Sequence, residues 1–187
     1  MNEAWHWALA ISLAGSPLLA QAPAPACGIT RRAILSDSGI GALRIGRRIA
    51  DVGAECRILS DTTTDNGEDG PVRTLVVQIS SMSVAAVVDS DRVQHIEVAS
   101  IGLRTQEGFG PGTLLSRLLQ GPGIRGFRGA ELELAAYVVV PSHCGMSFRV
   151  PWPAADDHSP AELDAAELAA FPEDSRVSEV LIFGCEH

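Results

Sequence analysis

Residues 75–98 read LVVQISSMSVAAVVDSDRVQHIEV, and this stretch decides the class of fold. It contains three runs, at 75–79, 84–88 and 96–98, that are either alternately apolar or short and wholly apolar. Such runs are typical of β-strands when turn residues bound them. The polar segment 89–92 between the last two runs has the composition of a hairpin connection. The stretch therefore predicts neighbouring antiparallel strands.

Further strands are expected downstream. The clearest one spans 132–140, where apolar residues alternate strictly: Leu132, Leu134, Ala136, Val138 and Val140. A second alternating run lies at 146–150, and a final buried strand is expected at 180–183.

Three helices are predicted between these strands. One apolar stripe at helical spacing consists of Ile45, Ile49, Val52, Cys56 and Leu59. A short helix should follow Thr113, which we expect to be its N-cap. The sequence Ser-Pro-Ala-Glu at 159–162 has the form of a capping box and predicts a helix over 160–170. Residues 61–70 are expected to be an exposed, turn-rich loop. The fold class that follows is α+β, with short helices packed on antiparallel sheet.

Composition excludes several chemistries. The chain has 187 residues, and its 14 basic residues are all arginine, against 23 acidic residues, for a net charge of −9. Without lysine there can be no Schiff base, no pyridoxal phosphate anchor and no phosphate-binding-loop lysine. An acidic chain is a poor ligand for nucleic acid, because binding to phosphates requires a basic surface. No cofactor is expected.

Residues 1–26 have the pattern of a secretory signal peptide, with a short apolar run followed by small residues and prolines. Cleavage is expected after Ala20 or Ala26. The remainder, 27–187, is then a single secreted α+β domain, and it contains no apolar run long enough for a transmembrane helix. The predicted location is secreted or periplasmic.

The four cysteines are Cys27, Cys56, Cys144 and Cys185. In an exported chain an even number indicates disulfides, and four cysteines permit three connectivities. Cys144 begins one predicted strand and Cys185 ends another. If these strands pair antiparallel, the two residues face each other, which favours Cys144–Cys185 and leaves Cys27–Cys56.

Two alternatives use the same cysteines. His143-Cys144 together with Cys185-Glu186-His187 could supply a Cys2His2 zinc site, and Cys144 could be a nucleophile with His143 as its base. Both are disfavoured on the expectation that His143 and Cys144 are neighbours in a strand, where adjacent side chains point to opposite faces.

Other motifs have simpler interpretations. Residues 121–126 match G-x-G-x-x-G, but they follow a helix and precede a strand, which is the wrong context for a dinucleotide site. The acids of 61–69 do not fit a calcium-binding loop.

His95 and Glu97 share the outward face of one strand and could meet a ligand together. Seven acids and no base lie between Arg149 and Arg176, which indicates a negative surface that could attract a basic partner. Only Trp152 and Tyr137 are candidate Trp or Tyr anchors of an interface in 27–187.

The pattern of helix followed by strands occurs twice. Gly46, Ile49 and Val52 align with Gly112, Leu115 and Leu118, sixty-six positions later, which suggests repeats over 39–100 and 105–187. This arrangement resembles the tandem modules of β-lactamase inhibitory protein and of the SmpA/OmlA-type lipoproteins. The segments Ile-Gly-Ala-Leu-Arg-Ile-Gly at 40–46 and Cys-Gly-Met-Ser-Phe at 144–148 are also similar to uncharacterised secreted bacterial proteins. The resemblance implies a binding or scaffold fold.

We therefore expect a non-catalytic exported binding or scaffold protein, with a protein partner in the cell envelope. The alternatives are a secreted hydrolase whose site is assembled from dispersed residues, with His95, Glu97 and His143 as the first to test, and an envelope structural protein.

Overall fold

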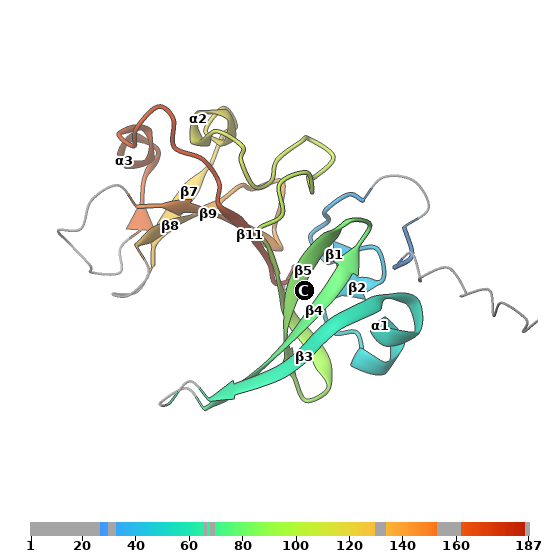
Figure 1. Cartoon of the computed structure of the whole chain (residues 1–187). Coiled ribbons are helices and arrows are strands. Elements are labelled where there is room, and N and C mark those ends of the chain that lie inside the picture. Colours follow the sequence, from blue (N-terminus) through green and yellow to red (C-terminus); the bar gives the residue numbers. More distant parts are fainter. Residues whose placement is uncertain are drawn as a thin grey trace, which may run out of the picture.

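A computed structural model describes residues 27–29, 33–65, 67, 70–129, 134–152 and 162–185 (Figure 1). The predicted signal peptide, residues 1–26, lies outside them. The helices are α1 (Ile49–Glu55), α2 (Leu115–Leu118) and α3 (Ala165–Ala169). The strands are β1 (Gly39–Ile40), β2 (Leu43–Arg44), β3 (Arg57–Asp65), β4 (Pro71–Ile79), β5 (Met82–Asp89), β6 (Arg92–Val98), β7 (Arg125–Arg128), β8 (Ala135–Val139), β9 (Met146–Pro151), β10 (Glu162–Leu163) and β11 (Glu179–Ile182).

Nine of these strands form one antiparallel sheet in the order β10-β7-β8-β9-β11-β6-β5-β4-β3. The first half is a meander that runs from β3 at the outside to β6 in the middle. The second half runs inward in the same way from β7 through β8 and β9 to β11, with β10 added at its outer edge. The two innermost strands, β6 and β11, pair with each other, and Val180 lies opposite Val98. The strands between residues 57 and 182 therefore form a single continuous sheet.

One face of this sheet carries the core. Side chains that alternate inward along every long strand fall in register, as Ile96, Ile182 and Met146 do on three neighbouring strands. All three helices contribute buried residues to the same apolar cluster. In Figure 1, α2 and α3 lie over the β7–β9 half, and α1 lies with β1 and β2 at the other half. Among the described residues, the three helices thus lie on the core side of the sheet, and none covers the opposite face, which we call the open face.

The strand predictions are largely confirmed. The runs at 75–79, 84–88 and 96–98 lie in β4, β5 and β6, and the run at 146–150 lies in β9. The strands predicted at 132–140 and 180–183 are shorter than expected or shifted, since β8 covers Ala135–Val139 and β11 covers Glu179–Ile182; Leu132 lies outside the described residues. The connection at 89–92 is a tight turn in which Ser90 and Asp91 have φ of 47° and 64°. Two successive positive φ angles are the signature of the type I′ hairpin turn, whose twist matches that of the flanking strands.

The first helix is shorter than its apolar stripe predicts. It begins at Ile49 and ends at Glu55, with Cys56 as its C-cap, and Arg57 already belongs to β3. The predicted loop at 61–70 is wrong over Asp61–Asp65, which continue the same strand. Threonine-rich sequence is compatible with a strand because β-branched side chains fit a pleated surface. The strand lies at the edge of the sheet and is exposed there, so it shows no apolar alternation.

The expected capping residues are also corrected. Thr113 does not cap α2; the N-cap is Leu114, and the Thr113 hydroxyl instead accepts the backbone N–H of Gly110. The helix predicted from 160 begins only at Ala165, after the short strand β10. A capping box is present, but Asp164 and Glu167 form it. Leu163 is drawn into the sheet because it pairs with Gly126 and is buried.

A glycine precedes both α1 and α2 in equivalent surroundings. Gly46 and Gly112 have φ of +76° and +87°, a region that glycine enters without steric cost. Gly46 donates its N–H to the carbonyl of Val93 at 2.7 Å, and Gly112 donates to Val177 at 2.6 Å. Gly46 thereby joins the segment before α1 to the start of β6, and Gly112 joins the segment before α2 to the residues just before β11.

Arginine side chains repeat the correspondence. Arg92 Nη1 donates to the carbonyl of Gly46 at 2.7 Å, and Arg176 Nη1 donates to the carbonyl of Gly112 at 3.0 Å. The first residues of the two helices, Ile49 and Leu115, donate their N–H groups to Asp91 and Ser175, respectively. We call these two sets of contacts the glycine–arginine clamps.

Candidate functional site

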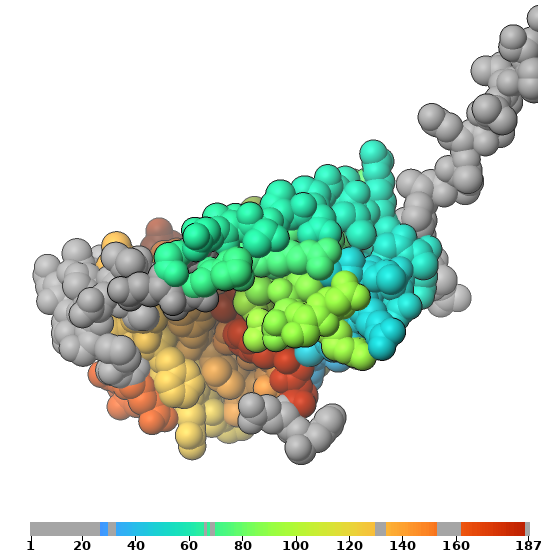
Figure 2. All heavy atoms as spheres, turned by 90° about the horizontal axis from the view of Figure 1, so that it is seen from below, coloured from blue at the N-terminus to red at the C-terminus, as the bar shows by residue number. Residues whose placement is uncertain are grey.

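The uncovered face of the sheet is a broad surface to which every one of the nine strands contributes. In Figure 2, viewed from the side opposite α2 and α3, the red C-terminal strand lies between green residues of the first half and orange residues of the second. Half-buried apolar side chains line this face, namely Val76, Ala85, Val87, Tyr137, Val139 and Leu181. Phe127 and Phe183 project from it with 44% and 49% of their surface exposed. Large exposed aromatic groups of this kind are typical anchors of an interface.

A polar group lies on the same face beside the central pair of strands. His95 Nε2 is 3.1 Å from Glu97 Oε1, so the two residues do share one face as predicted. The hydrogen bond from His95 lowers the pKa of Glu97, and the charge of Arg149 acts in the same direction against partial burial. The His95 ring also lies 6.1 Å from that of Phe183. The open face thus combines aromatic anchors with a charged centre.

His143 lies elsewhere. It belongs to the turn between β8 and β9, and its ring packs edge-on against Phe109 and Phe148 on the helix-covered side. Its Nδ1 is 3.6 Å from Asp37 Oδ1 and its Nε2 is 3.2 Å from Glu107 Oε2. Backbone and Thr105 hydrogen bonds, together with His143, hold the pKa of Glu107 below its usual value. Sequence reasoning missed both carboxylates, since each comes from a distant loop.

The structure therefore does not gather the three residues of the hydrolase alternative. His95 and Glu97 occupy the open face, whereas His143 is buried among core aromatics on the other face. Catalysis by a base and its partner requires them within hydrogen-bond reach of one substrate.

The two disulfides join Cys144 to Cys185 and Cys27 to Cys56, the pairing favoured by the antiparallel arrangement of β9 and β11. Asp37 Oδ2 lies 3.9 Å from Cys144 Sγ, so a carboxylate and two sulfurs are grouped. Both sulfurs are covalently bonded to each other and cannot ligate zinc as thiolates. His143 and Cys144 occupy a turn and not a strand. The expectation that their side chains point to opposite faces of a strand is therefore wrong. Glu186 and His187 lie outside the described residues.

The glycine-rich and acidic loops also have structural roles. Gly126 lies in β7, where an added Cβ would be 2.9 Å from the Leu168 side chain, so this glycine lets α3 approach the sheet. In the 61–69 segment, Arg73 donates two hydrogen bonds to Asp61 and lowers its pKa, and Asp65 accepts the N–H of Gly67. Glu68 and Asp69 lie outside the described residues.

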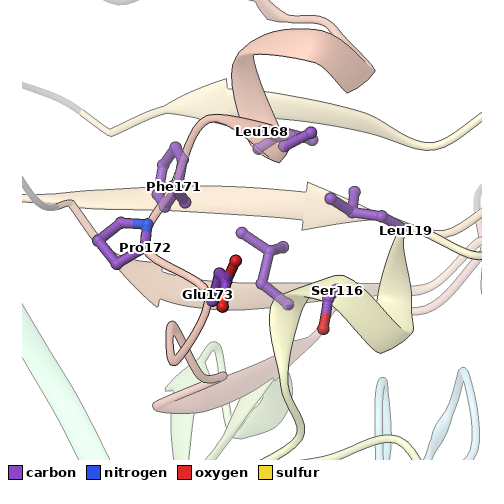
Figure 3. Close-up of a pocket in the computed structure, with 8 residues that line it drawn as sticks. Ser116, Leu119, Leu168, Phe171, Pro172 and Glu173 are labelled. Atoms are coloured by element: carbon purple, nitrogen blue, oxygen red, sulfur yellow. The ribbon is translucent and has the colours of Figure 1, made fainter.

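A groove of about 540 Å³ opens between α2 and α3 on the helix-covered side (Figure 3). Its floor consists of Leu115 and Leu168, which belong to the buried core. Its walls include Leu119 and Phe171, and Glu173 is its one charged lining residue. The ring of Trp152 packs edge-on against the ring of Phe171, with their centroids 4.9 Å apart, so this tryptophan contacts a wall of the groove and does not anchor the open face. Tyr137, in contrast, lies on the open face.

Of the acidic segment after Arg149, Glu173 lines this groove, whereas Glu162, Asp164 and Glu167 line a separate pocket with Arg125. Asp164 and Glu167 cap α3, and Glu162 lies 3.7 Å from Arg125. Glu173 and Asp174 are exposed and have no ion pair among the described residues. Asp156 and Asp157 lie outside the described part of the chain.

Comparisons with known proteins bear on the fold alone. No protein-family profile and no curated sequence matches the chain. The crystal structure of the uncharacterized protein YfeY from Escherichia coli is similar, with a TM-score of 0.53 and 15% identity, over 80% of this chain and 99% of that chain. At this identity the likeness indicates a shared architecture. Among the described residues, no helix is long and apolar enough to span a bilayer.

Proposed function

We propose that this chain is a non-catalytic exported binding protein that recognises a protein partner in the cell envelope through the open face of its sheet. The observation that carries the proposal is the uncovered, nine-stranded face with Phe127 and Phe183 projecting from it. Partly apolar faces of this extent are uncommon on proteins without partners. Two disulfides support an oxidising location, because such bonds persist outside the cytoplasm.

We further propose that the sheet consists of two copies of one module, as in the tandem families that the sequence resembles. The glycine–arginine clamps support this, because the same donors and acceptors recur at the same places in both halves. The direction of the strands supports it as well, since each half runs from the outside to the middle. The seam between modules is the β6–β11 pair, and it crosses the centre of the proposed binding face.

The separation of His95 and Glu97 from His143 weighs against the hydrolase alternative. Asp37 and Glu107 do converge on His143, but the side chain of His143 is only 8% exposed, whereas an assembled hydrolytic site requires acids and bases that meet in a cleft open to substrate.

Site-specific photocrosslinking in producing cells tests the proposal. The photoreactive residue p-benzoylphenylalanine replaces Phe127 or Phe183, one at β7 and one just after β11, and in separate controls replaces Ile34 or Ile101, which are exposed outside the nine strands. We expect both face positions to give the same discrete adduct and both controls to lack it. Absence of an adduct from the face, or an identical adduct from the controls, refutes recognition by this surface.

A further inference from the structure

The two edges of the nine-stranded sheet differ in how they are protected. β10, at one edge, has two residues, Glu162–Leu163, before the chain enters α3. β3, at the other edge, has nine residues, Arg57–Asp65, and no described segment pairs with its outer side. In Figure 2 its teal residues form one margin of the molecule. An unpaired strand of this length presents free N–H and C=O groups that can bind a further strand.

The second half of β3 lacks the features that usually block such pairing. Residues 60–65 read Ser-Asp-Thr-Thr-Thr-Asp, without lysine or proline, and the β-bulge of this strand lies before them, between Ile58 and Ser60. Residues 61–65 are all exposed, so both faces of the strand are accessible here. Edge strands are normally protected by lysine, proline, a bulge or short length, and threonine favours an extended backbone. This segment is therefore ready to accept another strand.

The charge around this edge is balanced although the whole chain is acidic. Arg73 on β4 donates from Nε and Nη2 to the two carboxylate oxygens of Asp61, at 2.8 Å and 2.7 Å. Arg57 and Asp65, at the two ends of β3, add one charge of each sign. These four side chains sum to zero, so a second copy of the chain that approaches β3 meets less repulsion than the net charge of −9 implies.

Charge also selects the register in which a second copy can pair. In an antiparallel pair about a two-fold axis, one residue faces itself, and residues directly opposite lie on the same side of the sheet. The regular part of β3, residues 60–65, then admits two registers that pair five residues, with the axis at Thr62 or at Thr63. An axis at Thr63 opposes Asp61 to Asp65 twice, which is destabilising. An axis at Thr62 opposes hydroxyl groups only to each other or to the carboxylate of Asp61, and such pairs can form hydrogen bonds.

We propose that β3 is a dimerisation edge, at which two copies of this chain pair antiparallel about a two-fold axis through Thr62. Ser60 then faces Thr64 of the second copy, and the two nine-stranded sheets continue into each other. The axis is perpendicular to the sheet, so the open faces of the two copies lie side by side and point in the same direction. The dimer thereby presents two equivalent recognition surfaces, an arrangement that raises the avidity for any partner with two matching sites.

Sedimentation velocity of the purified protein over a wide range of concentrations tests the proposal. We expect the weight-average mass to rise from that of one chain towards that of two. Thr62→Glu places two carboxylates opposite each other at the axis and should weaken the dimer about fivefold. Ser81→Glu is the matched control, because it makes the same charge change in the exposed turn between β4 and β5, and it should leave the dimer within about twofold.

Two further measurements are specific to the register. The Ser60→Glu, Thr64→Arg double variant sets opposite charges face to face twice, once on each side of the axis, and should strengthen the dimer about fivefold. A nitroxide spin label attached to Thr62→Cys should show dipolar broadening in the dimer, whereas the same label on Ser81→Cys should not. Thermal unfolding checks that each variant is folded.

A protein that stays monomeric at every concentration would overturn the proposal. A dimer that Thr62→Glu and Ser81→Glu weaken equally, or one that shows no broadening at position 62, would form through another surface and would overturn it as well.

Discussion

Removal of the Cys144–Cys185 disulfide gives the sharpest test of how this chain is stabilised. The bond closes a loop with a sequence separation of 41. Restricting the unfolded chain to such a loop stabilises the native state by about 3.9 kcal/mol in the chain-entropy description. Cys144 is exposed and Cys185 is half-buried, so a Cys144→Ala, Cys185→Ala double variant removes the constraint without opening a cavity.

The measurement is urea unfolding of the oxidised protein, followed by far-ultraviolet circular dichroism at neutral pH. We expect the free energy of unfolding to fall by about 4 kcal/mol and Tm to fall by roughly 8–16 °C. Reduced wild-type protein should lose more, because it also loses Cys27–Cys56.

The second disulfide serves as the comparison. It has a separation of 29 and should contribute about 3.6 kcal/mol by the same relation. Cys27 and Cys56 are 0% and 2% exposed, so their removal also disturbs core packing and should cost more than the entropy alone. A loss below about 1 kcal/mol for the Cys144, Cys185 variant would refute the loop-closure reasoning.

Three further outcomes are expected. Gly145→Ala should destabilise the fold by more than about 2 kcal/mol in urea unfolding, because the new Cβ would lie 2.3 Å and 2.8 Å from backbone atoms, whereas Gly121→Ala should be nearly neutral; equal effects would contradict this. The pKa of Glu97 is lower in the folded than in the unfolded state, so ionised Glu97 stabilises the fold at pH values above the ordinary carboxyl pKa. This stabilisation is lost as the pH falls through the pKa that Glu97 has in the folded protein. The free energy of unfolding, measured at several pH values, should show this loss in the wild type and not in Glu97→Gln. Leu168→Ala should cost about 2–5 kcal/mol, because the side chain is fully buried, and Leu134→Ala, half exposed, should change Tm little.

The sequence predicts the interior strands well because burial on one face imposes a period of two. Val84 to Val88 and the residues around Val138 are constrained by the core, and their apolar pattern is visible in the sequence. The edge strand β3 is not constrained in this way, so Thr62 and its neighbours read as a loop although they pair with β4. The apolar pattern of a sequence shows which residues are buried. It reveals strand pairing only where the paired residues are also buried.

The helices are less predictable for a related reason. α1 is interrupted at Cys56 because Arg57 pairs with Gln78 in the sheet, a contact between positions far apart in sequence. The open face could be anticipated from His95 and Glu97, whose polar side chains alternate with core residues. The groove between α2 and α3 could not be anticipated from the sequence, because tertiary contacts set the distance between these two helices.

The position of β11 constrains the order of events during folding. This strand, residues 179–182, occupies the middle of the sheet and pairs with both β6 and β9. A chain that emerges N-terminus first can form the β3–β6 meander early, but that half presents the bare backbone of β6 until residue 182 has emerged. Completion of the sheet thus depends on contacts between residues more than eighty positions apart, which makes it a slow step. Until it is complete, the unpaired edge of β6 can pair with other chains. Crossing a membrane unfolded and oxidising afterwards would postpone this vulnerable interval until the whole polypeptide is in one compartment.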